Sequence, residues 1–388
     1  MAEPKLHFTR EEYARRLAAT KAAIAAAGLD GLLLFKIEDM YWLTGVDTDG
    51  YYVFSAMLVK PDGHVEFLTR RVDYANVVYS SIIENCRIWD ERADTPRSAA
   101  IKAMLGDLGL KGKRLGVQLN TLGMRADLYV ELAAALDGFC TFVDASDVVG
   151  ALRRVKSEAE IAHMRKAADI LKKMERTALA MTRPGVFEGD ILAELYAIVY
   201  REDGDPSALR YPMGAGRAAN NARYTTGRNT IAENDHVMYE IGCAYRHYHA
   251  AVYFIALTGP KPDMRHQRIL DVCAEALEAG EAAMRPGNTI GDIHAAVKRV
   301  YAKNGLGAMP FKSLGYNLGA TFPPTWVDPP MIIEGEPTVL KEGMVLFLHP
   351  AIRLEEERLR MALGEQVVIR ANGVERITEA PRQLCLCG

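Results

Sequence analysis

The chain has 388 residues, of which 49% are hydrophobic and 25% charged, and its formal net charge is -3. This composition is ordinary for a globular protein, and the length exceeds what one compact core usually serves, so we expect two domains. The sequence contains no basic tract interleaved with aromatic residues and no apolar run long enough to span a bilayer. We therefore expect a cytoplasmic protein that binds neither nucleic acid nor membranes.

The six cysteines are scattered along the chain and lack the paired spacing of zinc fingers. A chain of this length does not need disulfide bonds for stability, so we expect reduced thiols. Cys385 and Cys387 lie close to the last residue and have no partner cluster in the sequence. We expect them in a frayed tail rather than in a metal site.

Residues 1–152 read as an α/β domain. Thr9 and Glu12 form a capping box that opens an amphipathic helix. Farther along, strand, helix and strand patterns follow one another at Arg114–Gln118, Ala126–Leu136 and Phe139–Val143. Such alternation predicts a mixed or parallel sheet with helices between its strands.

Residues 153–388 form the second predicted domain. A polar joint at Arg153–Lys156 precedes the capping box of Ser157 and Glu160, which opens a long helix ending near Met181. This domain contains an internal repeat, because Arg183–Ile191 recurs as Arg285–Ile293 with six identities in nine positions. We expect two helix-loop-helix units related by pseudo-symmetry, each backing a sheet, with a cleft between the halves.

The segment Val237–Ala251 predicts an antiparallel hairpin that carries ionisable groups on apolar strands. Glu240 lies on the first strand, and a period of two places His247, His249 and Ala251 on one face of the second. A buried ionisable group is costly unless it is paired. One interpretation is a structural Glu-His pair, and the other is a catalytic site.

Three features together resemble the creatinase/prolidase/methionine aminopeptidase superfamily. They are Lys156-Ser157-x-x-Glu160, the doubled Arg-Pro-Gly unit, and Tyr41–Gly45 within the N-terminal α/β domain. The resemblance covers nearly the whole chain. It implies an α/β (α+β) protein with a C-terminal pita-bread catalytic domain of pseudo-twofold symmetry, preceded by a creatinase-type N-terminal domain. It also implies a homodimer.

Metallopeptidases of the superfamily bind two metal ions through Asp, Asp, His, Glu and Glu. The resemblance places these ligands at Glu240, Ala251, Tyr316, His349 and Gly364 of this chain. Two bridging ions need several anionic oxygens, and three of the five positions cannot coordinate in that way. We therefore expect no metal and no other cofactor.

A single ion held by Glu240, His349 and Glu365 is the metal-dependent alternative that remains open.

The residues at these positions resemble a metal-independent branch that includes ectoine hydrolase and, more distantly, creatinase. Its members hydrolyse C–N bonds in small zwitterions. The resemblance implies Glu240 as general base or proton shuttle and Glu365 as a second carboxylate. His249 or His349 would protonate the departing nitrogen, and Tyr316 would donate a hydrogen bond into the same site.

Three further residues are candidates for binding a small-molecule substrate. Arg223 and Arg228 suit a bidentate grip on a carboxylate, and Trp326 suits one wall of a pocket. Arg228 lies in a predicted turn, where a solvated surface arginine is the commoner outcome. Arg223 stands where the superfamily usually keeps a histidine, and Ala251 departs from the branch as well.

Three functions remain open from the sequence. The first is a metal-independent C–N hydrolase acting on a cyclic amidine, guanidino or amide compound. The second is an Xaa-Pro dipeptidase or aminopeptidase with an atypical metal site. The third is a catalytically inactive pita-bread module that binds peptides or partners, since a fold does not prove an activity.

Overall fold

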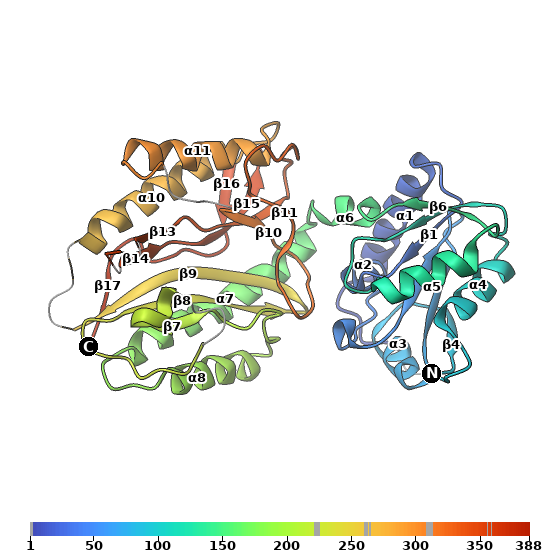
Figure 1. Ribbon diagram of the computed structural model, residues 1–388, viewed down its shortest axis with the longest axis horizontal. Helices are drawn as coiled ribbons and strands as arrows, with labels where there is room; N and C mark the ends of the chain where they lie inside the picture. Colours follow the sequence, from blue (N-terminus) through green and yellow to red (C-terminus); the bar gives the residue numbers. More distant parts are fainter. Residues whose placement is uncertain are drawn as a thin grey trace. The chain divides into compact units, whose positions relative to one another are not determined.

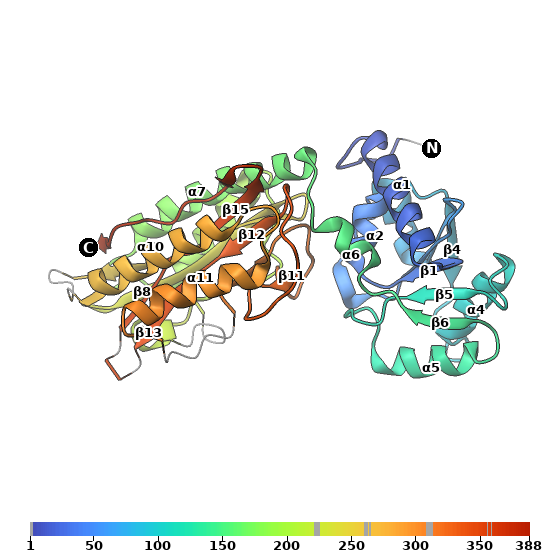
Figure 2. The same cartoon turned by 90° about the horizontal axis from the view of Figure 1, so that it is seen from above.

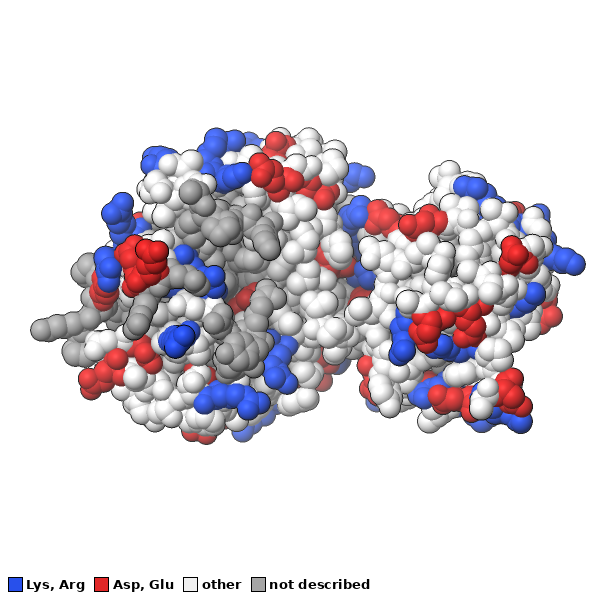
Figure 3. Space-filling view, in the orientation of Figure 1, with Lys and Arg blue, Asp and Glu red and all other residues white. Residues whose placement is uncertain are grey.

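A computed structural model describes most of the chain, namely residues 3–220, 226–259, 263, 265–307, 313–354, 356–357 and 359–388. The chain divides into two compact units, Met1–Arg153 and Arg154–Gly388, each with its own helices and sheets (Figure 1). On the face that Figure 3 shows, basic and acidic side chains are interspersed over both units. None of the helices within the described ranges has the length and apolar character that crossing a membrane requires.

The first unit is built around a six-stranded sheet with the strand order β4-β3-β2-β1-β5-β6. β2 pairs antiparallel with both β1 and β3, whereas the other neighbours are parallel, so the predicted mixed sheet is confirmed. The strands are β1 (Gly31–Leu34), β2 (Ala56–Val59), β3 (Val65–Arg70), β4 (Asn85–Trp89), β5 (Arg114–Val117) and β6 (Thr141–Asp144).

Helices surround this sheet, and Figure 2 shows α1 and α5 on opposite sides of β5 and β6. Ile101 of α4 and Leu128 of α5 are buried against Leu33 and Leu115 of the sheet. Each such side chain contributes roughly 1.5–3 kcal/mol when fully buried. The helices are α1 (Arg10–Ala26), α2 (Ile37–Thr44), α3 (Tyr74–Ser80), α4 (Arg97–Asp107), α5 (Ala126–Leu136) and α6 (Val148–Arg153).

The second unit has two main sheets between two pairs of helices (Figures 1 and 2). One sheet has the order β17-β9-β8-β7 and packs against α7, and the other has the order β11-β10-β12-β15-β16 and lies beneath α10. β13 and β14 form a separate hairpin that packs against β9 and α10. This layering is the pita-bread arrangement that the sequence predicts.

The helices of this unit are α7 (Glu158–Met181), α8 (Glu188–Arg201), α10 (Arg265–Ala283) and α11 (Ile290–Lys303). Its first strands are β7 (Met213–Ala215), β8 (His236–Tyr245), β9 (Tyr248–Thr258), β10 (Gly315–Asn317) and β11 (Asp328–Met331). The later strands are β12 (Val345–Leu348), β13 (Ala351–Leu354), β14 (Leu359–Ala362), β15 (Glu365–Arg370), β16 (Gly373–Arg376) and β17 (Cys385–Cys387).

The internal repeat has the predicted structural role. Its first copy joins α7 to α8 and its second joins α10 to α11. Gly185 and Gly287 occupy the same place in the two copies and have φ angles of 85° and 95°, a left-handed conformation that glycine adopts without steric cost. The shared Arg-Pro-Gly sequence therefore encodes the same turn twice.

The prediction of a frayed tail at Cys385 and Cys387 is wrong. These residues belong to β17, which pairs in parallel with β9 from Ala256 to Thr258. β9 would otherwise present an unpaired edge of backbone N–H and C=O groups, and the tail satisfies part of that edge.

Glu365 lies in a buried charge cluster on the α10 side of its sheet. Its carboxylate accepts hydrogen bonds from Nε and Nη2 of Arg382, at 3.0 and 2.8 Å, and from the backbone N–H of Ala380 at 3.0 Å. Arg376 approaches the same carboxylate at 3.3 Å and binds Glu281 of α10 at 2.6 Å. Burial raises the pKa of Glu365 to about 7, with Arg382 opposing the rise and Glu281 adding to it.

This cluster predicts a pH-dependent stability. The pKa of Glu365 is about 7 in the folded chain, against 4.5 for an ordinary glutamate, so the folded state binds more protons between these pH values. Stability should therefore fall as pH rises from about 5 to 7. We expect Glu365→Gln to flatten this slope when the melting temperature is measured by calorimetry across that range. The exposed Glu356→Gln serves as control, and equal slopes for Glu365→Gln and the unmodified protein would contradict the prediction.

Candidate active site

The hairpin of β8 and β9 presents one face to the candidate site. Glu240 lies directly opposite Tyr253, and Ala244 lies opposite His249. The prediction that His247 shares the face of His249 and Ala251 is wrong, because His247 lies in the two-residue turn before β9 with a φ of 65°. Its ring stacks on Phe322 with a centroid distance of 4.1 Å.

A chain of hydrogen bonds holds Glu240. The indole Nε1–H of Trp326 donates to Oη of Tyr316 at 2.6 Å, and the Tyr316 hydroxyl donates to Oε1 of Glu240 at 3.3 Å. All three side chains are buried. The phenol oxygen accepts the indole proton, and the carboxylate can only accept. The single proton of the Tyr316 hydroxyl therefore points toward Glu240.

Gly242 explains why Trp326 can reach this position. A Cβ at residue 242 would lie 2.9 Å from the Trp326 ring and 2.5 Å from the carbonyl oxygen of Ala250. Gly242 is two residues beyond Glu240 and therefore on the same face of β8. The missing side chain admits the indole beside the carboxylate.

His349 lies next to the same phenol. It follows β12, and its backbone N–H donates to the carbonyl of Leu314 at 2.8 Å. Its half-buried ring is 5.4 Å from the ring of Tyr316 and 6.4 Å from that of Tyr253. The structure thus brings together four of the predicted site residues, Glu240, Tyr316, Trp326 and His349.

His249 has a different environment, in which both ring nitrogens are occupied. Nε2 accepts a hydrogen bond from the backbone N–H of Ala208 at 2.9 Å, and Nδ1 lies 2.9 Å from the carbonyl oxygen of His247. These partners select the tautomer that carries its proton on Nδ1. Burial lowers the pKa of His249 to about 4. The imidazole is therefore neutral at physiological pH and fixes a loop, which does not suit the acid role predicted for it.

Glu365 is also separated from Glu240, in contrast to the prediction. Adjacent residues of a strand face opposite sides of the sheet. A Cβ at Gly364 would lie 2.6 Å from Cβ of Tyr253 and 3.1 Å from Cβ of His349, so position 364 faces the site. Glu365 consequently faces the charge cluster beneath α10.

Of the two predicted arginines, only Arg228 can be placed, and it does not join this group. Arg223 lies outside the described residues. Arg228 is exposed, as its turn position suggested, and its backbone N–H donates to Glu188 at 2.9 Å.

Sequence reasoning missed Tyr253 and Arg360. Arg360 of β14 donates from Nε to Oη of Tyr253 at 3.1 Å, and its Nη2 donates to the same oxygen. The period of two from His249 through Ala251 identifies Tyr253 as a residue of the site face. Arg360 has no such signal, because the docking of β14 against β9 is a tertiary contact.

The donor groups around Glu240 do not fit a dinuclear metal centre. Among the described residues, no group of three or more His, Cys, Asp or Glu side chains is arranged to hold a metal ion. One carboxylate, one imidazole and two phenols do not supply the anionic bridging oxygens that two ions need. We therefore derive no chemical step through a metal.

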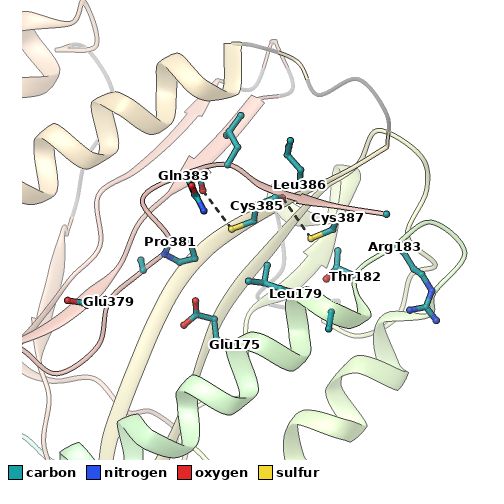
Figure 4. A pocket seen from close by; sticks show the side chains of 14 residues that line it. Glu175, Leu179, Thr182, Arg183, Glu379, Pro381, Gln383, Cys385, Leu386 and Cys387 are labelled. Atoms are coloured by element: carbon teal, nitrogen blue, oxygen red, sulfur yellow. Dashed lines mark hydrogen bonds between the residues drawn. The ribbon is translucent and has the colours of Figure 1, made fainter.

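A separate pocket of about 750 Å³ lies between α7 and the C-terminal segment (Figure 4). Its lining includes Glu175, whose pKa burial raises to about 7, and the two cysteines of β17. Burial raises the pKa of Cys385 to about 12, so its thiol is a poor nucleophile at neutral pH. None of the residues gathered around Glu240 lines this pocket.

Residues 162–371 match metallopeptidase family M24, and residues 16–155 match the creatinase/prolidase N-terminal domain. The chain is similar to an ectoine hydrolase of Halomonas elongata, with 27% identity over 99% of each chain. It is also similar to a probable dipeptidase PepE of Mycobacterium bovis, with 26% identity over 97% of each chain.

Among solved structures, dipeptidase PepE of Mycobacterium ulcerans superposes with a TM-score of 0.84 at 24% identity, covering 98% of this chain and 99% of the other. The prolidase of Thermococcus sibiricus superposes with the same TM-score at 20% identity, covering 97% of this chain and 99% of the other. These two likenesses establish the fold. Because the family match covers more than half of the chain, the protein is a hydrolase of metallopeptidase family M24 that carries a creatinase/prolidase N-terminal domain.

Proposed function

We propose that this protein hydrolyses a C–N bond of a small zwitterionic compound without a metal ion, as an ectoine hydrolase or a close analogue. The observation that carries this proposal is the state of the Glu240 carboxylate. It is 8% exposed, and Oε1 accepts a hydrogen bond from Tyr316. Within the described part of the chain, Oε2 has no hydrogen-bond partner. A nearly buried carboxylate with one free oxygen is suited to bind and deprotonate a water molecule.

The reaction would proceed through a tetrahedral intermediate. Glu240 takes a proton from a water molecule, and the oxygen of that water attacks the carbon of the amidine or amide. The C–N bond then breaks, and the departing nitrogen receives a proton from His349, which lies beside Tyr316. Trp326 orients the Tyr316 hydroxyl, which in turn holds the Glu240 carboxylate. The carboxylate therefore needs little reorganisation during the reaction.

Two sets of relatives support different substrates. The likeness to an ectoine hydrolase over the full chain favours a cyclic amidine. The relatives named dipeptidase and Xaa-Pro dipeptidase favour a peptide bond, which is the second candidate. We favour the first because the donor set around Glu240 does not fit two metal ions.

Substrate and metal dependence can be tested together. We expect purified protein to hydrolyse ectoine, hydroxyectoine or creatine at an unchanged rate in excess chelator, with product measured by chromatography. A matched set of Xaa-Pro dipeptides provides the comparison. Dipeptide cleavage that chelator abolishes and added divalent metal restores would overturn the proposal in favour of the second candidate.

The two glutamates should differ sharply in their effects. Glu240→Gln removes the base and should lower kcat by roughly 100- to 10,000-fold while the melting temperature stays close to that of the unmodified protein. Glu365→Gln alters a buried cluster on the other face of the sheet, so kcat at 25 °C should change by less than about fivefold. Comparable losses of kcat in both variants would contradict the assignment of Glu240 alone.

The two histidines should differ in the same way. His349→Gln should lower kcat by roughly 100-fold or more, because the departing nitrogen loses its proton donor. His249→Ala leaves the Ala208 N–H without an acceptor and should cost about 1–3 kcal/mol of stability while kcat of the folded protein persists. Unfolding free energy from urea titration and kcat for each variant separate the two roles. Loss of kcat in folded His249→Ala with activity retained in His349→Gln would reverse them.

A further inference from the structure

Arg360 is a partly buried cation that has no acidic partner among the described residues. Its Nε and Nη2 donate to Oη of Tyr253, and Nη1 donates to the carbonyl oxygen of Ala219 at 2.8 Å. Both acceptors are neutral. No Asp or Glu within the described ranges forms an ion pair with this guanidinium.

Three other arginines contact carboxylates although their burial differs: Arg153 is buried, Arg382 is half-buried like Arg360, and Arg376 is exposed. Arg153 binds Asp39 at 3.0 Å, Arg382 binds Glu365 at 2.8 Å, and Arg376 binds Glu281 at 2.6 Å. Removing an arginine from water without a counter-charge is unfavourable. Arg360 is therefore better explained by a charge that a ligand supplies.

Tyr253 connects Arg360 to the candidate active site. It lies directly opposite Glu240 in the hairpin, where cross-strand side chains are neighbours. Burial raises the pKa of the Tyr253 hydroxyl, so the phenol is neutral and does not compensate the guanidinium. Its hydroxyl donates to Sδ of Met238 at 3.0 Å and accepts from Arg360.

Glu240 is the complementary case, a carboxylate that forms no ion pair with a basic residue in the described part of the chain. Among the described residues, the only hydrogen-bond partner of its carboxylate is the neutral Tyr316. Glu240 and Arg360 thus flank Tyr253 as one uncompensated negative and one uncompensated positive charge. A ligand with one cationic and one anionic group, and no net charge, balances both.

We infer that Arg360 binds the carboxylate of the substrate and sets the specificity of the site for an amino-acid-like zwitterion. This inference rests on the proposed function, because it takes the C–N group of that substrate to lie at Glu240. A carboxylate fits better than a phosphate, since one guanidinium balances one negative charge and grips both carboxylate oxygens in a planar fork.

The register of the β13–β14 hairpin supplies a matched control. Arg353 lies directly opposite Arg360, is exposed, and donates to the carbonyl oxygen of Asn220 at 3.1 Å. The two arginines therefore share a strand pair and a similar backbone contact, whereas Arg360 is the one that donates to Tyr253.

The test compares ectoine with its carboxamide in the unmodified protein, Arg360→Met, Arg360→Lys and Arg353→Met. For Arg360→Met we expect kcat/KM for ectoine to fall roughly 10- to 100-fold, the range for hydrogen bonds to a charged group, with less than a threefold change for the carboxamide. Arg360→Lys should recover part of the preference for the acid. Arg353→Met should change kcat/KM for both compounds by less than about threefold.

The outcomes distinguish this inference from the proposed function. If the unmodified protein binds ectoine in calorimetry without turnover, the proposed function fails, and an acid-over-carboxamide preference that Arg360→Met abolishes would still support the inference. If ectoine is hydrolysed and Arg360→Met weakens acid and carboxamide equally, the inference fails and Arg360 merely supports Tyr253. If neither compound binds, both are overturned.

Discussion

The arrangement of the candidate site depends on keeping a carboxylate inside an apolar sheet without an ion pair to any basic residue that the structure describes. Glu240 meets this condition through a single neutral hydrogen bond from Tyr316, which Trp326 orients in turn. A salt bridge would neutralise this carboxylate, whereas a neutral phenol leaves its charge available to a bound water molecule or substrate. Tyr316 and Trp326 thus hold the Glu240 carboxylate in position without neutralising its charge.

The pita-bread fold brings the partners of Glu240 to it from a second sheet. Glu240 lies in the sheet that packs on α7, whereas Tyr316 and His349 come from the sheet beneath α10. The repeated Arg-Pro-Gly turn sets the same helix-to-helix path in both halves. Tyr316 is 76 residues from Glu240 in the sequence, yet the two side chains meet where the two sheets face one another.

Much of the fold and part of the site could be predicted from the sequence. The helix caps at Thr9 and Ser157, the repeat and the hairpin are local patterns, and Glu240, Tyr316 and His349 follow from positions that the superfamily uses for ligands. The errors arose where a neighbour in space decides the outcome. The state of His249 depends on the Ala208 N–H, and the role of Arg360 depends on how β14 docks. Glu365 was misplaced because one step along a strand reverses the face of the sheet.

Gly364 also limits which side chains can be introduced next to Glu240. The position is held by a backbone bridge to Tyr253, and a side chain there would collide with that residue, with Phe347 and with His349. A single Gly364→Glu substitution would therefore not supply a metal ligand, because Tyr253, Phe347 and His349 occupy the space of the new side chain. A carboxylate at this position would require smaller side chains at the neighbouring positions as well, and those changes would alter the packing around Tyr253 and His349.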